Sequence, residues 1–321
     1  MYPMKYRKLG KTGLKTSVIG LGTWQFGGEW GKNFTQTEVT DILAKARDLG
    51  INLIDTAECY GDHVSESLIG NAIVGRTAGR REDWIVATKF GHTFHGHLKR
   101  TDDRSASDVL RQLEDSLRAL QTDYIDLYQY HSVRDTEFDN QELRTVLDRA
   151  VRDGKIRHLG NSVSSNSSAN DEMHQVDGST AAQVEAIQVV YNRLDRTPET
   201  NLLPSCQRQN LGVLARVPLA SGFLTGKYKA GATTPASFTQ GDVRHSHDAQ
   251  KLEARLREVE QIQKSEVPPG LEMSKWALAW CLLNPAITCV IPGSKDIAQL
   301  TANATTADLE MVGTDHPLAW T

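Results

Sequence analysis

Short apolar runs alternate with longer amphipathic segments through most of this chain of 321 residues. The runs are too short for helices and are typical of buried strands, whereas the segments between them repeat their apolar residues with helical spacing. Strands that alternate with helices form a parallel sheet. Eight such units in a chain of this length predict an α/β fold in which the sheet closes into a (β/α)8 TIM barrel. The eight expected strands cover residues 17–21, 51–54, 84–89, 124–130, 156–160, 186–191, 212–217 and 288–291.

Two features are expected in addition to the barrel units. Residues 6–16 predict an N-terminal β-hairpin around a Lys-Thr-Gly turn. Residues 222–248 are rich in Gly, Thr and Pro and predict a long loop after strand seven. We expect residues 1–321 to form a single domain. The expected helices cover residues 37–49, 65–73, 105–120, 141–153, 200–210, 249–265, 271–283 and 296–303, and a weak helix is expected within the loop 161–180. The buried face of the third helix is expected to carry Leu110, Leu113, Leu117 and Leu120.

A doubly wound open sheet is the main alternative fold. Such sheets bind dinucleotides through the pattern G-x-G-x-x-G at the end of the first strand. Gly20 lies within the first expected strand and Gly22 and Gly27 follow it, but their spacing does not match this pattern. The closed barrel therefore remains the expected fold.

Composition excludes several classes of partner. The net charge is −4 and acidic and basic residues are interspersed, which gives no support for a nucleic-acid-binding surface. No apolar run is long enough to cross a bilayer, and the first residues do not form a signal peptide. The four cysteines are scattered, which suits a reducing compartment. We therefore expect a cytoplasmic protein that binds neither nucleic acid nor a membrane.

Three of the expected strands end in a side chain that is unusual beside a buried apolar run. Asp55 follows the second strand, Lys89 ends the third, and His131 follows the fourth. A buried carboxylate needs a cation or several hydrogen-bond donors nearby. The C-terminal ends of barrel strands meet at one rim, where active sites of this fold lie. We therefore expect Asp55, Lys89 and His131 to converge, with Tyr60 on the adjacent loop.

These four residues suit the transfer of a proton to a carbonyl oxygen. A free tyrosine has a pKa of about 10, and the Lys89 ammonium is expected to bring the pKa of Tyr60 down. Asp55 would keep Lys89 charged, and His131 would donate a hydrogen bond to the substrate oxygen. Taken one by one, each residue also has a structural interpretation. Asp55 and Lys89 could form a structural ion pair, Tyr60 could be a packed loop aromatic, and His131 a core histidine.

Seven segments of the chain resemble the aldo-keto reductase family, in the family's order and along nearly the whole length. They are IGLGTW, LIDTAECYG, IVATKFG, TDYIDLYQYH, GKIRHLG, PLASGFLTGKY and VIPGSKDIAQLTAN. The resemblance implies a catalytic tetrad of Asp55, Tyr60, Lys89 and His131. It also implies an NADP(H)-dependent oxidoreductase that transfers hydride between the nicotinamide and a carbonyl or alcohol substrate, an aldehyde, ketone or sugar. Trp24, Tyr60 and His131 are expected to contact the substrate.

The resemblance further implies that the cofactor, NADP (NADPH), lies across the barrel mouth. Ser162 and Gln188 match the residues that hold the nicotinamide carboxamide, although Val163 stands where asparagine is frequent. Arg216 stands where many members carry a stacking tyrosine. The other residues expected to bind the cofactor are Gly22, Thr23, Trp24, Asp55, Pro218, Leu219, Ala220, Gly222, Leu224, Lys227, Gly293, Ser294, Lys295, Gln299 and Asn303.

Preference for NADP(H) over NAD(H) is expected from the opening of the last helix. A ribose phosphate needs a cation or several donors. Ser294 and Lys295 precede that helix, whose N-terminus also favours anions. Arg244 is a second candidate cation if the long loop folds over the mouth. The competing interpretation is that Lys295 is a solvated residue offset by Asp296.

Two alternative functions remain open from the sequence. Potassium-channel β-subunits also resemble the family, so a cofactor-binding regulatory subunit is the alternative to an enzyme. The other is a metal site in GHTFHGH, where His92, His95 and His97 have a zinc-like spacing. No acidic ligand of matching spacing accompanies them, so we expect a mouth or surface loop there and no metal.

Overall fold

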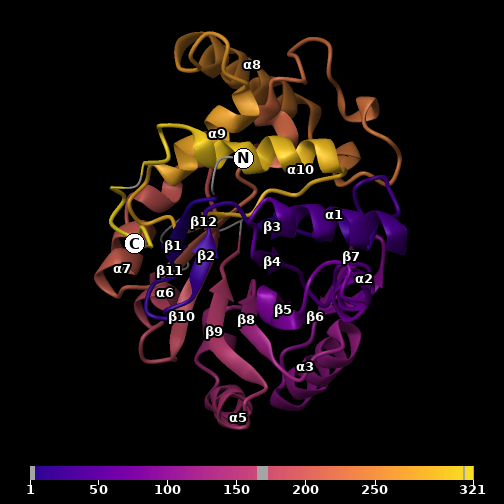
Figure 1. Cartoon of the computed structure of the whole chain (residues 1–321), viewed down its shortest axis with the longest axis vertical. Coiled ribbons are helices and arrows are strands. Elements are labelled where there is room, and N and C mark those ends of the chain that lie inside the picture. Colours follow the sequence, from indigo (N-terminus) through magenta and orange to yellow (C-terminus); the bar gives the residue numbers. More distant parts are fainter. Residues whose placement is uncertain (1–3, 165–172, 314, 321) are drawn as a thin grey trace.

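The computed structural model describes residues 4–164, 173–313 and 315–320. Eight parallel strands form one sheet at its centre (Figure 1). In spatial order they are β12 (Cys289–Val290), β11 (Gly212–Arg216), β10 (Val184–Val190), β9 (Ile156–Ser162), β8 (Ile125–His131), β5 (Ile85–Phe90), β4 (Leu53–Asp55) and β3 (Leu21–Gly22).

The first and last strands of this sheet meet, so the barrel closes. Parallel bridges join Ile19 to Val290 and Gly22 to Gly293. The amide of Gly20 also donates to the carbonyl oxygen of Val290 over 2.8 Å. The predicted (β/α)8 barrel is thus confirmed, although β3 is shorter and begins later than the sequence pattern indicated. That the whole chain is a single domain stays a prediction.

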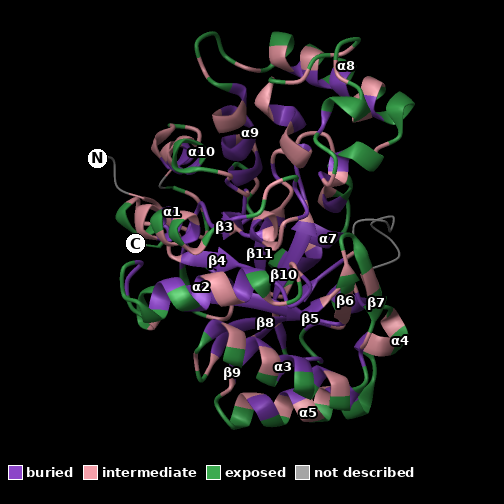
Figure 2. Ribbon diagram, turned by 90° about the vertical axis from the view of Figure 1, so that its right-hand side faces the viewer, coloured by how far each residue is buried: buried purple, intermediate pink, exposed green. Residues whose placement is uncertain are grey.

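Most of the helices surround the strands, but the helix at 249–265 lies farther out and packs against the loop after β11 (Figure 2). The helices are α1 (Gln36–Asp48), α2 (Val64–Val74), α3 (Ala106–Leu120), α4 (Asp135–Phe138), α5 (Gln141–Arg152), α6 (Met173–Asp177), α7 (Leu202–Arg208), α8 (Ala249–Ser265), α9 (Met273–Leu282) and α10 (Ile297–Ala304). Helix α1 begins with a capping box between Thr35 and Glu38, which satisfies two amides of its first turn. The weak helix expected in 161–180 corresponds to α6, and residues 165–172 lie outside the described part.

The expected face of α3 was wrong in one position. Leu113, Leu117 and Leu120 are buried as predicted, but Leu110 is 38% exposed and Val109 is buried in its place. Val109 and Leu113 are four residues apart and therefore share a helix face, whereas Leu110 is turned away by about 100°. Val109 was omitted because the prediction used only the spacing of the leucines.

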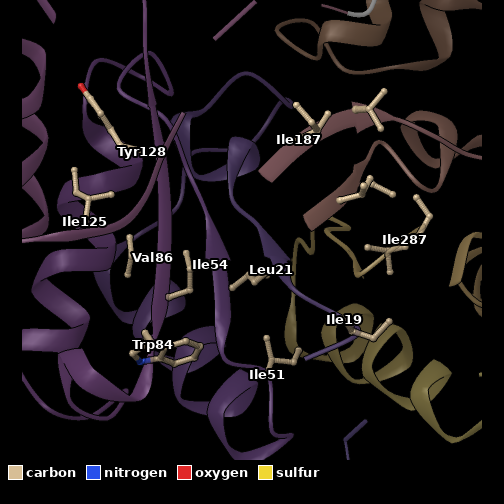
Figure 3. Close-up of a cluster of buried hydrophobic side chains, with 14 of the residues drawn as sticks. Ile19, Leu21, Ile51, Ile54, Trp84, Val86, Ile125, Tyr128, Ile187 and Ile287 are labelled. Atoms are coloured by element: carbon tan, nitrogen blue, oxygen red, sulfur yellow. The ribbon is translucent and has the colours of Figure 1, made fainter. Parts of the chain in front are cut away.

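Side chains on the strands alternate between two hydrophobic layers. The outer layer fills the space between strands and helices, and Figure 3 shows Ile54, Val86 and Tyr128 within it. The inner layer lies inside the barrel and includes Leu53 and Ala87. This alternation decides which strand residues can reach the interior of the barrel.

The base of the barrel is closed by the two ends of the chain. The predicted N-terminal hairpin is present, with β1 (Tyr6–Lys8) antiparallel to β2 (Lys15–Ser17). Leu9 follows β1 and packs in the inner layer of the barrel. The C-terminal segment pairs with β1 through a bridge between Arg7 and Ala319.

The rim at the opposite end carries two long excursions. The loop after β11 contains three short 3-10 helices, η4 (Ala220–Thr225), η5 (Pro235–Ser237) and η6 (Val243–Ser246). It contacts the loop after β3, where the Val243 amide donates to the Glu29 carbonyl oxygen over 3.0 Å. The second excursion, GHTFHGH, was expected to be a loop and is instead a hairpin of β6 (His92–Gly96) and β7 (Lys99–Asp102). None of the described helices has the length and apolar character needed to cross a bilayer.

Candidate active site

The strand alternation brings the predicted residues to one place. Leu53 faces the barrel interior, so Asp55 does as well, two residues later on β4. Lys89 likewise stands two residues after the inward-facing Ala87 on β5. His131 stands four residues after the inward-facing Leu127 on β8, which is also an even spacing and therefore the same face. All three polar residues stand at the C-terminal ends of their strands, above the apolar inner layer.

Lys89 is fully buried and connects the group. Its Nζ donates to Asp55 Oδ2 over 2.9 Å, to the Thr56 carbonyl oxygen over 2.6 Å, and to the Tyr60 hydroxyl over 3.3 Å. Burial by itself would lower the pKa of Lys89, but the Asp55 carboxylate and Tyr60 raise it above its usual value. The ammonium is therefore charged inside the barrel.

Asp55 has donors on both of its oxygens. While Oδ2 pairs with Lys89, Oδ1 accepts from Gln188 Nε2 at 2.6 Å and from Gln129 Nε2 at 3.3 Å. These amides supply the donors that a buried carboxylate requires. Gln129 was not predicted, because a glutamine in an apolar run carries no distinctive signal.

The pKa of Tyr60 does not follow the sequence prediction. Lys89 was expected to bring it down, and the ammonium does act in that direction, but burial is the larger effect and raises the pKa of Tyr60 to about 12. The hydroxyl is therefore protonated at neutral pH. This state suits a proton donor, since the group must carry the proton that it gives.

His131 is a neutral imidazole. Burial lowers the pKa of His131 well below its usual range, and the nearby cations Lys89 and Arg216 lower it further. Its ring lies edge-on to Tyr60, with centroids 6.4 Å apart. A neutral ring can donate one hydrogen bond, and the tautomer decides which nitrogen does so.

Two tryptophans stand beside this group. Trp24 lies parallel to the Tyr60 ring with centroids 6.1 Å apart, and Trp30 packs edge-on against Trp24 at 5.2 Å. The Trp24 indole donates to Glu29 Oε2 over 2.6 Å. Glu29 is buried and also pairs with Arg100 of β7. Neither Glu29 nor Arg100 was expected at the site from the sequence, because their contact depends on the unpredicted hairpin.

The residues expected at the carboxamide are neighbours. Ser162 ends β9 and its hydroxyl donates to Gln188 Oε1 over 3.2 Å. Arg216 ends β11 and donates to the Val163 carbonyl oxygen over 2.8 Å. Thr23 supports the same rim, since its hydroxyl donates to the Asp55 carbonyl oxygen over 2.8 Å. All these groups lie on the rim that carries Lys89.

The segment expected at the pyrophosphate has an unusual backbone. Val217, Ala220, Ser221 and Gly222 all have positive φ, between 48° and 90°. For a β-branched residue such as Val217 this conformation is strained, and strain of this kind clusters at functional sites. The side chains of Ala220 and Leu224 are buried against α8 and α9, so only their backbone is available to a ligand. Pro218 and Leu219 precede η4, and Lys227 beyond it is exposed.

The long loop does bring Arg244 toward Lys295. Arg244 forms a bidentate pair with Asp242, with Nη2 to Oδ2 at 2.6 Å and Nε to Oδ1 at 2.9 Å. Lys295 Nζ lies 3.7 Å from the same Asp242 carboxylate and donates to the Trp30 carbonyl oxygen. Two cations thus share one carboxylate, which leaves a net positive charge.

The other residues of the last expected segment have structural contacts. Asp296 caps α10 by accepting from the Gln299 amide at 2.7 Å, and Gln299 Oε1 accepts from the Lys295 amide at 3.0 Å. Asn303 donates to the hydroxyl of the buried Ser294 over 3.2 Å. A Cβ on the neighbouring Gly293 would displace the end of the Gln25 side chain, whereas a Cβ on Gly22 would meet the Ile291 carbonyl oxygen at 2.7 Å.

The histidines of GHTFHGH are separated by the hairpin. His92 faces the site, with its ring 4.7 Å from that of His131. His95 and His97 are exposed, and His95 Nε2 lies 2.7 Å from the Thr101 hydroxyl on the paired strand. The three histidine side chains therefore do not converge on one metal position, although their spacing in the sequence suggested one.

Comparison with known proteins agrees with this geometry. The family model described as "Aldo/keto reductase family" matches residues 18–316. The chain belongs to the aldo/keto reductase family. The aldo-keto reductase YhdN of Bacillus subtilis is 34% identical over 307 residues, which cover 93% of this chain and 87% of that protein.

Two further relatives differ in the role that their names state. The holo form of the aldo-keto reductase AKR11C1 from Bacillus halodurans superposes with a TM-score of 0.77 at 27% identity, covering 99% of this chain and 97% of that one. A protein of Arabidopsis thaliana named as a probable voltage-gated potassium channel subunit beta is 29% identical over 310 residues, covering 95% of this chain and 92% of its own. The family therefore includes proteins with different named roles.

Proposed function

We propose that this protein is an NADPH-dependent carbonyl reductase, acting in the reverse direction as an alcohol dehydrogenase on CH–OH donors, with Tyr60 as the general acid. One observation carries the proposal. The Tyr60 hydroxyl lies 3.3 Å from the charged Lys89 Nζ, which is itself held by Asp55. Reduction of a carbonyl needs a proton at the oxygen as negative charge develops there, and a phenol next to a fixed ammonium can supply it.

The residues at the mouth suit a nicotinamide cofactor. Ser162 and Gln188 offer a hydroxyl and an amide side by side, which match the donor and acceptor of a carboxamide. The left-handed backbone at Val217, Ala220, Ser221 and Gly222 brings main-chain atoms to the surface of the rim. Lys295 and Arg244 provide the positive charge that a ribose phosphate requires. When bound, NADPH supplies the hydride.

The four central residues then have distinct tasks. Tyr60 gives its proton to the substrate oxygen, and Lys89 stabilises the phenolate that remains. Asp55 keeps Lys89 charged and fixed in position. His131 donates a hydrogen bond to the substrate oxygen and orients it, while Trp24 forms an aromatic wall beside Tyr60. A sugar or another small polar carbonyl compound suits the polar groups around this wall.

The test of this proposal is the turnover of a panel of aldehydes, ketones and sugars by wild type and Tyr60→Phe. Loss of the hydroxyl should lower kcat by about 10² to 10⁴. The affinity for NADPH should hardly change, because the ring is kept. Tyr6→Phe is the control, since it removes a hydroxyl that bonds the Gly50 carbonyl oxygen away from the mouth. If Tyr60→Phe kept more than half of the wild-type kcat, Tyr60 would not be the proton donor.

A second candidate function is that of a cofactor-binding regulatory subunit of a channel. It rests on the 29% identity to the Arabidopsis thaliana protein along nearly the whole chain. The two candidates differ in turnover and assembly. A reductase should convert at least one substrate of the panel at more than 1 per second, near the low end of enzyme rates (about 1 to 10³ per second). Slow turnover across the whole panel, together with an oligomer in size-exclusion chromatography, would favour the regulatory subunit.

A further inference from the structure

Three potential metal ligands lie next to Tyr60, and only one of them, His131, has a task in the proposed reaction. They are the Glu58 carboxylate, the Cys59 thiol and the Nδ1 nitrogen of His131, and their ligand atoms all lie within 4.8 Å of one another. His131 Nδ1 is 3.7 Å from Glu58 Oε1 and 3.9 Å from Cys59 Sγ. The first distance is too long for a hydrogen bond, and the second is near the upper limit for a hydrogen bond that involves sulfur.

Glu58 adds a second and independent observation. It is 3% exposed, and its Oε1 accepts from the His92 amide over 3.0 Å. Its other oxygen, Oε2, is buried and has no hydrogen-bond partner among the described residues. A buried carboxylate with an unpartnered oxygen is costly, and a bound cation is one of the few ways to compensate it.

Three of the protein cations around His131 have carboxylate partners other than Glu58. Lys89 pairs with Asp55, Arg100 with Glu29, and Arg104 with Glu137 at 2.7 Å. Each of these positive charges has its own carboxylate. None of these three cations forms an ion pair with Glu58.

The chemistry of the three ligands indicates which metal ion would bind. One thiolate, one imidazole and one carboxylate are the ligands that Zn²⁺ prefers, whereas Mg²⁺ and Ca²⁺ require oxygen ligands. Zinc bonds of about 2.0 to 2.3 Å place tetrahedral ligand atoms about 3.3 to 3.8 Å apart. The 3.7 and 3.9 Å separations are close to this spacing, and the third pair of ligand atoms lies within 4.8 Å, so the side chains would have to move closer together to form a tetrahedral site.

We propose that Glu58, Cys59 and His131 bind one Zn²⁺ ion, with water as the fourth ligand. Binding converts the thiol to a thiolate and releases its proton to solvent, so the two ligand charges balance the ion. Because the metal occupies Nδ1 of His131, the ring proton must stay on Nε2. The ion also connects the loop after β4 to the end of β8. This proposal concerns binding and does not depend on the proposed reductase activity.

The test is a titration of the full-length, untagged and metal-free protein with Co²⁺ and then Zn²⁺. Co²⁺ bound to a thiolate gives a sulfur-to-metal charge-transfer band, which should saturate at one ion per chain and disappear when Zn²⁺ displaces Co²⁺. Cys59→Ala and Cys59→Ser should both remove the band, and the serine variant keeps the shape of the side chain. Each of these variants and Glu58→Gln should weaken Zn²⁺ binding by at least about tenfold, the loss seen even for groups that only support a ligand.

Two controls separate this site from others. Cys206→Ala removes a buried thiol in α7, and His95→Gln removes an exposed imidazole of the hairpin; both should bind Zn²⁺ as wild type does. The proposal is overturned if wild type shows no charge-transfer band, or if the band persists in both Cys59 variants. It is equally overturned if Zn²⁺ binding survives in Cys59→Ala and Glu58→Gln but is lost in His95→Gln, because the hairpin would then hold the ion.

Discussion

Lys89 is charged although water does not reach it, because three acceptors surround its ammonium group. A buried lysine without such acceptors would lose its proton. Because Lys89 contacts the Tyr60 hydroxyl, a change at Lys89 also alters the pKa of Tyr60. At the scale of single residues, the site is therefore one connected unit rather than four independent side chains.

Lys89→Met should raise the pKa of Tyr60 above its present value of about 12, because the ammonium is the main opposition to the effect of burial. It should reduce kcat by at least about 10², a loss of the size seen when acid–base catalysis is removed. Asp55→Asn should reduce kcat less, since an asparagine oxygen can still accept from Lys89. The pH dependence of kcat for both variants measures this. If Asp55→Asn matched wild type in shape and height, the Asp55–Lys89 pair would have only a structural role.

Lys295→Ala tests the choice between the two cofactors. Removing one of the two cations that share Asp242 should weaken NADPH binding about ten- to a hundredfold and leave NADH binding nearly unchanged. Fluorescence titration with both cofactors gives the two Kd values. Lys45→Ala, which removes a lysine from the last turn of α1, is the control. Equal wild-type affinities, or a preference that survives Lys295→Ala, would show that this lysine does not select the cofactor.

The alternation of side chains between the two faces of a strand explains which residues of the candidate site could be predicted. Asp55, Lys89 and His131 follow apolar runs, so both their position at the rim and their inward direction follow from the sequence. Glu58 and Gln129 could not be found in this way. The burial of Glu58 depends on how the loop after β4 turns, and the partner of Gln129 is a carboxylate 74 residues away.

At the scale of elements, the hairpin β6–β7 is the part that the sequence did not reveal. Its residues are polar and half-exposed, so they lack the apolar alternation of a buried strand. It is held to the barrel mainly by contacts from other elements. Arg100 pairs with the buried Glu29 and also donates to the Cys59 carbonyl oxygen over 3.1 Å. The hairpin is therefore defined by tertiary contacts.

Arg100→Met should destabilise the protein by about 3 kcal/mol, because it leaves the Glu29 carboxylate buried without its cation. The double variant Glu29→Leu/Arg100→Met should lose less than Arg100→Met alone, since no unpaired charge then remains. Urea unfolding of the two variants measures the difference. Arg111→Met, which removes a half-exposed ion pair with Asp103, should change stability by less than about 1 kcal/mol. A double variant less stable than Arg100→Met would contradict this account.

At the scale of the whole molecule, His316 links the C-terminal segment to the turn after α9. Its Nδ1 accepts from the Leu318 amide over 3.2 Å, and Nε2 lies 3.1 Å from the Asn284 carbonyl oxygen. These bonds require the neutral ring with its proton on Nε2. Burial, and then the nearby Arg7, lower the pKa of His316 to about 4. The unfolded chain should take up this proton near pH 6.5.

His316 should therefore contribute to a loss of stability on acidification. Above about pH 6.5 both states are neutral at this position, and between about pH 6.5 and 4 only the unfolded state binds the proton, so stability falls as pH falls. His316→Gln should reduce the drop in Tm between pH 7 and pH 5, because glutamine can make the same two hydrogen bonds without titrating. His95→Gln is the control. An identical drop in wild type and His316→Gln would exclude this role.

The pairing of the chain ends has a practical consequence. The Trp320 amide donates to the Tyr6 carbonyl oxygen over 2.9 Å, and the Lys8 amide to the Leu318 carbonyl oxygen over 2.8 Å. Both segments lie at the base of the barrel, while Asp55, Lys89 and His131 lie at the opposite rim. A short linker could therefore join residues 5 and 320 and new termini could be opened in a surface loop, giving a circularly permuted chain with the same barrel.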